Sequence, residues 1–185
     1  MPPFPVIQTQ RLLLRELTLD DAPRLFDIHG NADAMRYFGT DPLKESHEAE
    51  KLIAKFAALR DGPNPGVRWA LVARETGELL GTCGLFGWNR EWHRCLMGYE
   101  LAESSRGQGY MGEALRAAIA WGFAEMQLNR FEVLIHPDNE PSLRLAQRLG
   151  FRREGLLREV ARWGGAFHDL MQLSLLRREW HDGAT

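Results

Sequence analysis

The segment Arg106–Gly112, "RGQGYMG", has the composition of a loop that binds phosphate. Gly107 and Gly109 allow backbone conformations that expose consecutive N–H groups, and the helix expected to begin near Tyr110 directs its positive end toward them. Arg106 can bind one phosphate oxygen. The segment is therefore a candidate pyrophosphate site, although a strand-to-helix turn without a ligand would use the same glycines.

The same segment contains G-x-G-x-x-G, the fingerprint of dinucleotide-binding folds. Such a loop follows the first strand of its domain, and an acidic residue about 20 residues further on ends the second strand. Here Glu132 has that spacing but falls at the start of its predicted strand, and Asp138 lies too far along. We therefore favour a different kind of phosphate loop over a dinucleotide site.

The elements that position this loop follow from hydrophobic periodicity. A Pro/Gly-rich loop at 60–66 separates two predicted helices, capped by Asp20 and Ser46, from a meander of three strands. The order then continues as one β-α-β unit, a short helix and a final hairpin, which predicts an α+β, mixed α/β fold with helices on both faces. The predicted strands are 9–17, 68–74, 77–88, 93–102, 130–136, 157–163 and 168–175, and the later helices are 110–126 and 139–149.

Composition excludes several classes of protein. A chain of 185 residues fits a single domain, 1–185, and a net charge of −2 gives no global reason to bind nucleic acid or an anionic membrane. No apolar run reaches membrane-spanning length, and the N-terminus lacks the pattern of a signal peptide. Cys83 and Cys95 have no C-x-x-C spacing. We expect a cytoplasmic protein with free thiols and no metal.

Four ordered segments resemble the GNAT superfamily of acyl-CoA-dependent N-acetyltransferases. The family loop Q/R-x-x-G-x-G/A is matched from Arg106 to Met111, except that Met111 stands where Gly or Ala is usual and Gly112 follows one residue later. "GYMGEAL" resembles the loop variant of the Rim-type branch, the ribosomal-protein N-terminal acetyltransferases. "TQRLLLRELTLDDAPRLFDI", "GELLGTCGL" and "HPDNEPSLRLAQRLGFRREG" resemble its opening strand and helix, its central hairpin and its second motif.

The resemblance implies a GNAT fold, with a mostly antiparallel, twisted sheet of about seven strands that splays into a V between strands 4 and 5. It implies acetyl-CoA as co-substrate, with no metal, and a pantetheine arm that hydrogen-bonds to the backbone of Glu100, Leu101 and Ala102. The pyrophosphate would lie on the loop and the helix start, at Arg106, Gly107, Gln108, Gly109, Tyr110, Met111 and Gly112.

Asn139 and Ser142 carry the second motif. Both residues suit the first turn of a helix for purely structural reasons, because Asn is a preferred N-cap and Pro141 needs no hydrogen-bond acceptor. The resemblance implies in addition that Asn139 contacts the cofactor arm and that Ser142 assists the departing CoA thiolate. Tyr110 lies in the loop and is unsuited to that second role.

The sequence leaves three candidates for the base that accepts the amine proton: Glu100, Glu159 and water. Glu100 is the first candidate, because its strand lies beside the expected thioester. The position of a glutamate used by some Rim-type members aligns with Ala161, and Glu159, on the same expected strand face, is a substitute. Water alone suffices for a protein N-terminal α-amine, whose pKa of roughly 7.7–8 leaves on the order of a tenth of it neutral at pH 7.

Aromatic side chains are the candidates for the acceptor site. Tyr37, Trp88 and Trp163 are assigned to the substrate, with Trp92 also available, and we expect 88–94 to be a loop that contributes to specificity. The most favoured function is acetyl transfer to a primary amine, above all a protein N-terminal α-amine. The alternatives are a small amine (a polyamine, an aminoglycoside or an amino-acid-like toxin) and a non-catalytic acyl-CoA-binding module. The sequence leaves the acyl chain and the oligomeric state, including a homodimer, open.

Overall fold

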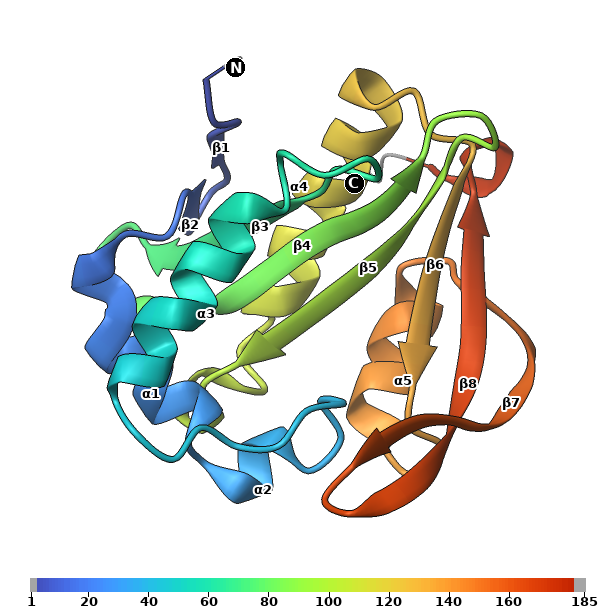
Figure 1. The fold of residues 1–185 in the computed structure, drawn as a ribbon. Helices are drawn as coiled ribbons and strands as arrows, with labels where there is room; N and C mark the ends of the chain where they lie inside the picture. Colours follow the sequence, from blue (N-terminus) through green and yellow to red (C-terminus); the bar gives the residue numbers. More distant parts are fainter. Residues whose placement is uncertain (1–2, 182–185) are drawn as a thin grey trace.

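A computed structural model describes residues 3–181 of the chain, and eight strands in this part form one twisted sheet (Figure 1). The strand order is β1-β2-β3-β4-β5-β6-β8-β7. The predicted mixed α/β fold is confirmed, and the additional strand is the two-residue β1 at the edge of the sheet. The strands are β1 (Ile7–Gln8), β2 (Leu12–Arg15), β3 (Val67–Ala73), β4 (Leu79–Asn89), β5 (Arg94–Leu101), β6 (Arg130–Ile135), β7 (Arg152–Trp163) and β8 (Ala166–Leu176).

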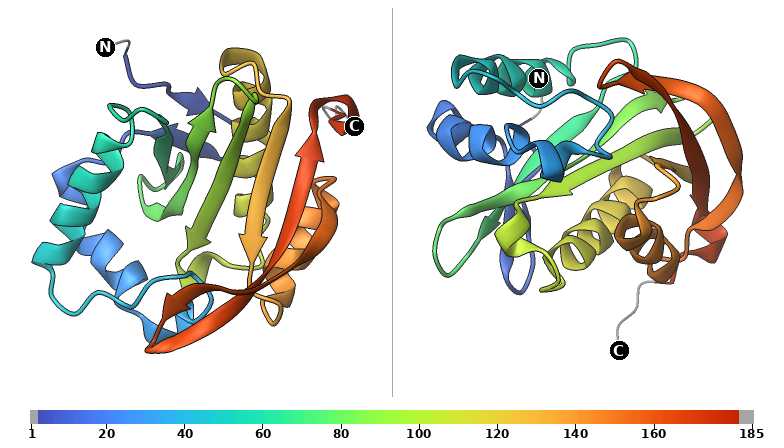
Figure 2. Two further views of the ribbon diagram at one scale, coloured as in Figure 1. Left: turned by 45° about the vertical axis from the view of Figure 1, so that its right-hand side comes forward. Right: turned by 90° about the horizontal axis from the view of Figure 1, so that it is seen from below.

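Helices cover both faces of the sheet, as Figure 2 shows most clearly in its right-hand view. One face carries α1 (Ala22–His29), α2 (Ala32–Met35) and α3 (His47–Ala58), and the other carries α4 (Tyr110–Glu125) and α5 (Glu140–Arg148). Strand β3 is buried along its whole length and contributes side chains to two hydrophobic cores, one on each face of the sheet. Trp69 packs in the core with α4, and Ala70 packs in the core with α1 and α3. Alternation along a strand produces this division.

The sheet opens between β5 and β6, which are the only parallel neighbours among the described strands. Their pairing ends at Leu96 and Glu132. Beyond that point β5 continues to pair with β4 as far as Leu101, and β6 pairs with β8 as far as Ile135. The two strands therefore diverge toward their C-terminal ends, as in Figure 1, and form the predicted V.

Several local predictions need correction. Asp20 does not cap α1, because Asp21 occupies the cap position and its carboxylate accepts the Thr18 N–H at 2.8 Å. Helix α3 begins after Ser46 as predicted, but the Ser46 side chain makes no capping bond. Segment 88–94 is not one loop, since β4 runs to Asn89 and β5 begins at Arg94. The sequence also gave no indication of α2 or of the first residues of β7.

None of the helices within residues 3–181 has the length and apolar character needed to cross a membrane. Cys83 and Cys95 are buried free thiols, and burial raises the pKa of Cys83 to about 12. In the same part of the chain, no group of three or more His, Cys, Asp or Glu residues is arranged to hold a metal ion.

Candidate active site

The glycine loop joins the C-terminal end of β5 to the first residue of α4. Gly107 and Gly109 have φ angles of +75° and +82°, which L-residues with a side chain rarely adopt. Gly109 immediately precedes Tyr110, so the unpaired N–H groups of the first turn of α4 lie at the end of the loop. Met111, which departs from the family motif, is buried in the core, and Gly112 lies within the helix. The loop and helix start therefore have the geometry that suits an anion.

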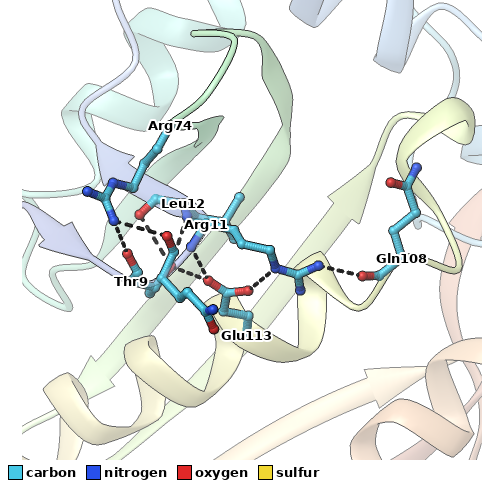
Figure 3. Close-up of polar contacts among 7 residues, drawn as sticks. Thr9, Arg11, Leu12, Arg74, Gln108 and Glu113 are labelled. Atoms are coloured by element: carbon cyan, nitrogen blue, oxygen red, sulfur yellow. Dashed lines mark hydrogen bonds and ion pairs between the residues drawn. The ribbon is translucent and has the colours of Figure 1, made fainter.

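The side chains of Arg106 and Gln108 in the loop contact backbone carbonyls of nearby residues. Gln108 donates to the Ser104 carbonyl at 3.0 Å, and Arg106 approaches the Leu101 carbonyl at 3.4 Å. The guanidinium of Arg11 donates to the Gln108 carbonyl at 2.9 Å (Figure 3). The loop is therefore held from the turn between β1 and β2.

Two hollows flank the loop. One, of about 570 Å³, is lined by polar groups from the β3–β4 hairpin and the loop, including Arg11, Arg74, Thr76, Gln108 and Tyr110. The other, of about 440 Å³, lies between α1–α2 and the end of β5, where Asn31, Ala34, Ala102 and Glu103 contribute to its walls. Ser104, which precedes the glycine loop, contributes to both hollows.

The edge of β5 that faces the V is unpaired beyond Leu96 among the described strands. The other edge is occupied: the Ala102 N–H donates to the Leu80 carbonyl at 2.8 Å. The Ala102 carbonyl accepts the Ser105 N–H at 3.0 Å, so both backbone groups of Ala102 are engaged, and strand alternation directs those of Glu100 to β4 as well. Of the three residues expected to bind the arm, Leu101 is the one whose backbone groups can bind a ligand that lies in the V as an additional strand would. An arm with amide groups that ends in a pyrophosphate fits the edge and the loop together.

The Tyr99 hydroxyl is buried and lacks a hydrogen bond of good geometry among the described residues. Burial raises the pKa of Tyr99 to about 12, an effect that the Ser142 side chain partly offsets from the first turn of α5. The Asn139 side chain accepts the Ser142 N–H at 3.3 Å and so caps this helix. A buried hydroxyl that has no well-formed hydrogen bond among the described residues is the feature expected where a polar ligand binds.

Glu100 belongs to a buried network on the opposite face of β5. Its carboxylate accepts hydrogen bonds from Arg68 and Thr82, and His29 Nε2 lies 3.1 Å from it. Arg68 also donates through Nε to the Thr82 hydroxyl at 2.7 Å. Burial alone raises the pKa of Glu100, but the Arg68 charge and the hydrogen bonds from His29 and Thr82 hold that pKa below its usual value. Glu100 is therefore ionised, and its oxygens are already engaged.

An aromatic cluster lies at the open end of the V, where β6 ends. Tyr37 stacks on His136 with ring centres 4.8 Å apart, and Trp163 stacks on His168 at 3.7 Å. The Trp163 indole N–H donates to the Arg36 carbonyl at 3.0 Å, which ties the β7–β8 hairpin to the segment after α2. The structure thus brings together Tyr37 and Trp163, two of the aromatic residues predicted from sequence.

Trp88 and Glu159 lie apart from this cluster. Trp88 lies near the end of β4, beside the closed end of the V. Glu159 is exposed, with φ of +50°, in a bulge that shifts the register between Leu157 and Ala161. The expectation that Glu159 shares a face with Ala161 is wrong, because the bulge interrupts the alternation of the strand.

Sequence reasoning did not identify Tyr99, His29 or His136. Tyr99 precedes Glu100, so strand alternation could have shown that the two side chains face opposite sides of the sheet. His136 ended a predicted strand, which is a common position for functional residues. The contact of His29 with Glu100 joins distant segments, and no local pattern signals it.

Comparison with known proteins identifies relatives over most of the chain. The family model for the acetyltransferase (GNAT) domain matches residues 11–152. The chain is 32% identical over 174 residues to the uncharacterized N-acetyltransferase YoaA of Bacillus subtilis (strain 168), covering 94% of this chain and 98% of that protein. It is also 32% identical over 184 residues to the [ribosomal protein uS5]-alanine N-acetyltransferase of Escherichia coli (strain K12), covering 96% and 93%. The crystal structure of a probable acetyltransferase superposes with a TM-score of 0.83 at 28% identity, covering 95% of this chain and 98% of that one.

Proposed function

The chain belongs to the GNAT acetyltransferase family and is an acetyl-CoA-dependent N-acetyltransferase, and we propose that its acceptor is the N-terminal α-amine of a protein. The observation that carries this proposal is the aromatic and imidazole surface of the cluster at the open V. Tyr37, His136, Trp163 and His168 contribute aromatic and imidazole surface. Glu100 is a buried carboxylate near the end of β5, and the positive charge of Arg68 neutralises its negative charge.

Such a surface suits a peptide better than a polyamine. A polycation gains from a strongly acidic pocket, and a peptide N-terminus brings a single amine followed by backbone and side chains that can pack on aromatic rings. The relative that acetylates the alanine of ribosomal protein uS5 supports the same class of acceptor.

This chain's residues hold the donor in three places. The N–H groups around Gly107 and Gly109, with Arg106, bind the pyrophosphate of acetyl-CoA. The unpaired edge of β5 at Leu101 would bind an amide of the pantetheine arm, and Asn139, whose oxygen caps α5, would be a further contact of the arm. When bound, acetyl-CoA supplies the activated acyl group as a thioester.

Ser142 and Tyr99 act at the leaving group. As the amine forms its C–N bond and the C–S bond breaks, negative charge develops on sulfur. The Ser142 hydroxyl donates a hydrogen bond to that sulfur. Tyr99, whose pKa of about 12 keeps its phenol protonated at neutral pH, stands beside Ser142 as a second donor.

The proton of the amine passes to water. About a tenth of an α-amine is neutral at pH 7, whereas a lysine side chain is neutral to only about one part in a few thousand. An α-amine therefore needs no strong base, which agrees with the engaged, ionised state of Glu100. Glu100 then serves to hold the end of β5 in place.

A thiol-release assay with acetyl-CoA tests the proposal. Peptides that begin with alanine or serine should be acetylated much faster than spermidine or an aminoglycoside. Ser142→Ala should lower kcat and leave the Kd for CoA nearly unchanged, with Ser46→Ala as the control because the Ser46 side chain makes no capping bond. Preference for spermidine would contradict the proposed acceptor. If CoA binds but none of the amines causes release of the CoA thiol, the protein is a binding module.

A further inference from the structure

Arg11 joins two segments that lie far apart in the sequence. It lies in the turn between β1 and β2, and its guanidinium contacts the glycine loop and the first turn of α4 together (Figure 3). Nη1 donates to the Gln108 carbonyl at 2.9 Å, and Nε donates to Glu113 Oε2 at 2.7 Å. The Arg11 guanidinium also lies 4.6 Å from the ring centre of Tyr110, the first residue of the helix. One side chain thus fixes the loop relative to the helix.

Glu113 is a firm anchor for Arg11. Its Oε1 accepts the Thr9 hydroxyl at 2.6 Å and the Arg11 backbone N–H at 2.7 Å. Burial raises the pKa of Glu113, but the hydrogen bonds from Thr9 and Arg11 hold that pKa below its usual value. The carboxylate is therefore ionised in the first turn of α4, where its charge opposes the binding of a phosphate at the same helix end. Arg11 neutralises that charge.

The hydrogen bond to Gln108 sets the direction of a loop amide. A trans peptide directs its C=O and N–H to opposite sides, and the described residues contain no cis peptide. Because Arg11 draws the Gln108 carbonyl toward itself, the Gly109 N–H points to the other side of the loop. Gly109 cannot easily gain a side chain, because its φ of +82° is a conformation that L-residues with a side chain rarely adopt.

We propose that Arg11 is a positioning residue for pyrophosphate binding, which orients the amides of the glycine loop through Gln108 while Glu113 holds it in place. This inference rests on the proposed use of acetyl-CoA and adds a role for a residue outside the loop. The opening segment that contains Thr9 and Arg11, and the glutamate that follows the glycine loop, thereby gain a joint function.

Two substitutions separate positioning from simple attraction of charge. Arg11→Lys keeps the charge, but an ammonium group lacks the planar fork that reaches Gln108 and Glu113 together. Glu113→Gln removes the anchor and also removes a negative charge near the phosphates. Charge attraction alone predicts that Arg11→Lys binds normally and that Glu113→Gln binds CoA more tightly. Positioning predicts that both variants bind CoA about tenfold more weakly.

Arg15→Lys is the matched control. Arg15 lies on the neighbouring strand and makes two bonds to Asp21, at 2.7 and 2.8 Å, without touching the loop. It should lower the melting temperature of the free protein as Arg11→Lys does, because each variant loses one arm of a forked contact. It should leave the Kd for CoA unchanged.

The experiment is isothermal titration of the four proteins with CoA and with 3′-dephospho-CoA, which retains the pyrophosphate. Equal losses of affinity for both ligands in Arg11→Lys and Glu113→Gln, with none in Arg15→Lys, support the inference. A loss of affinity for CoA but not for 3′-dephospho-CoA would overturn it, because Arg11 would then bind the 3′-phosphate. Normal binding by Arg11→Lys, or tighter binding by Glu113→Gln, would also overturn it. If the wild-type protein bound neither ligand, the proposed function would fail and the inference with it.

Discussion

Replacing Glu100 by glutamine tests whether this carboxylate is structural. The substitution leaves the Arg68 guanidinium buried beside a neutral amide, because Arg68 and Glu100 are each less than 10% exposed. Removing one partner of a buried ion pair costs about 3–5 kcal/mol. For a chain of this size we expect a melting temperature lower by roughly 6–20 °C in a thermal unfolding scan.

The same variant has a defined pH dependence. The pKa of Glu100 in the folded protein lies below its ordinary value of 4.5, so the carboxylate stabilises the fold above about pH 4.5. That stabilisation is lost as the pH falls through the lower, folded-state pKa. The gap in unfolding free energy between wild type and Glu100→Gln should therefore be largest near pH 7 and should shrink in acid.

A paired substitution supplies the control. Arg68→Met combined with Glu100→Leu removes both charges, and it should be more stable than Glu100→Gln because no buried charge remains unpaired. The reasoning would be refuted if Glu100→Gln melted with the wild type. Full stability together with a large loss of kcat and a shifted pH–rate profile would restore Glu100 as the base.

Three further results are expected. Gly109→Val should abolish measurable CoA binding, because a β-branched residue is strained at a φ of +82°, and the circular dichroism spectrum should remain native. Tyr99→Phe should change the unfolding free energy by less than about 1 kcal/mol, since the hydroxyl has no well-formed hydrogen bond to lose, and should lower kcat. Glu154→Gln should reduce the acid sensitivity of unfolding between about pH 4.5 and 2, because hydrogen bonding to Arg130 lowers the pKa of Glu154 to about 2. That effect should stay below about 1 kcal/mol, since the Glu154 side chain is 40% exposed.

Periodicity predicted most of the fold, because strands and helices with one buried face carry a regular pattern. Helix α4 and strand β6 begin at the predicted residues, Tyr110 and Arg130. Helix α2 escaped prediction because four residues cannot show helical periodicity. The bulge at Glu159 escaped because it depends on the backbone φ and on a contact between its N–H and the Asp169 carboxylate at 2.8 Å.

In the candidate site, too, local motifs could be predicted from the sequence and contacts between distant segments could not. The glycine loop and the Asn139 cap are local motifs, and sequence places both correctly on the fold. The contacts of Glu100 could not be inferred, because its partners Arg68 and His29 come from other elements and only the folded sheet brings them together. Whether a carboxylate is already hydrogen-bonded and ion-paired depends on tertiary contacts, which the residue pattern of one strand does not indicate.

The most direct test of the account is to locate the acetyl group on a single acceptor. The enzyme is incubated with isotope-labelled acetyl-CoA and a peptide that carries both a free N-terminal alanine and an internal lysine, and the product is sequenced by tandem mass spectrometry. The account predicts label on the α-amine and none on the lysine. Label on the lysine side chain, or transfer to added spermidine in place of the peptide, would contradict it.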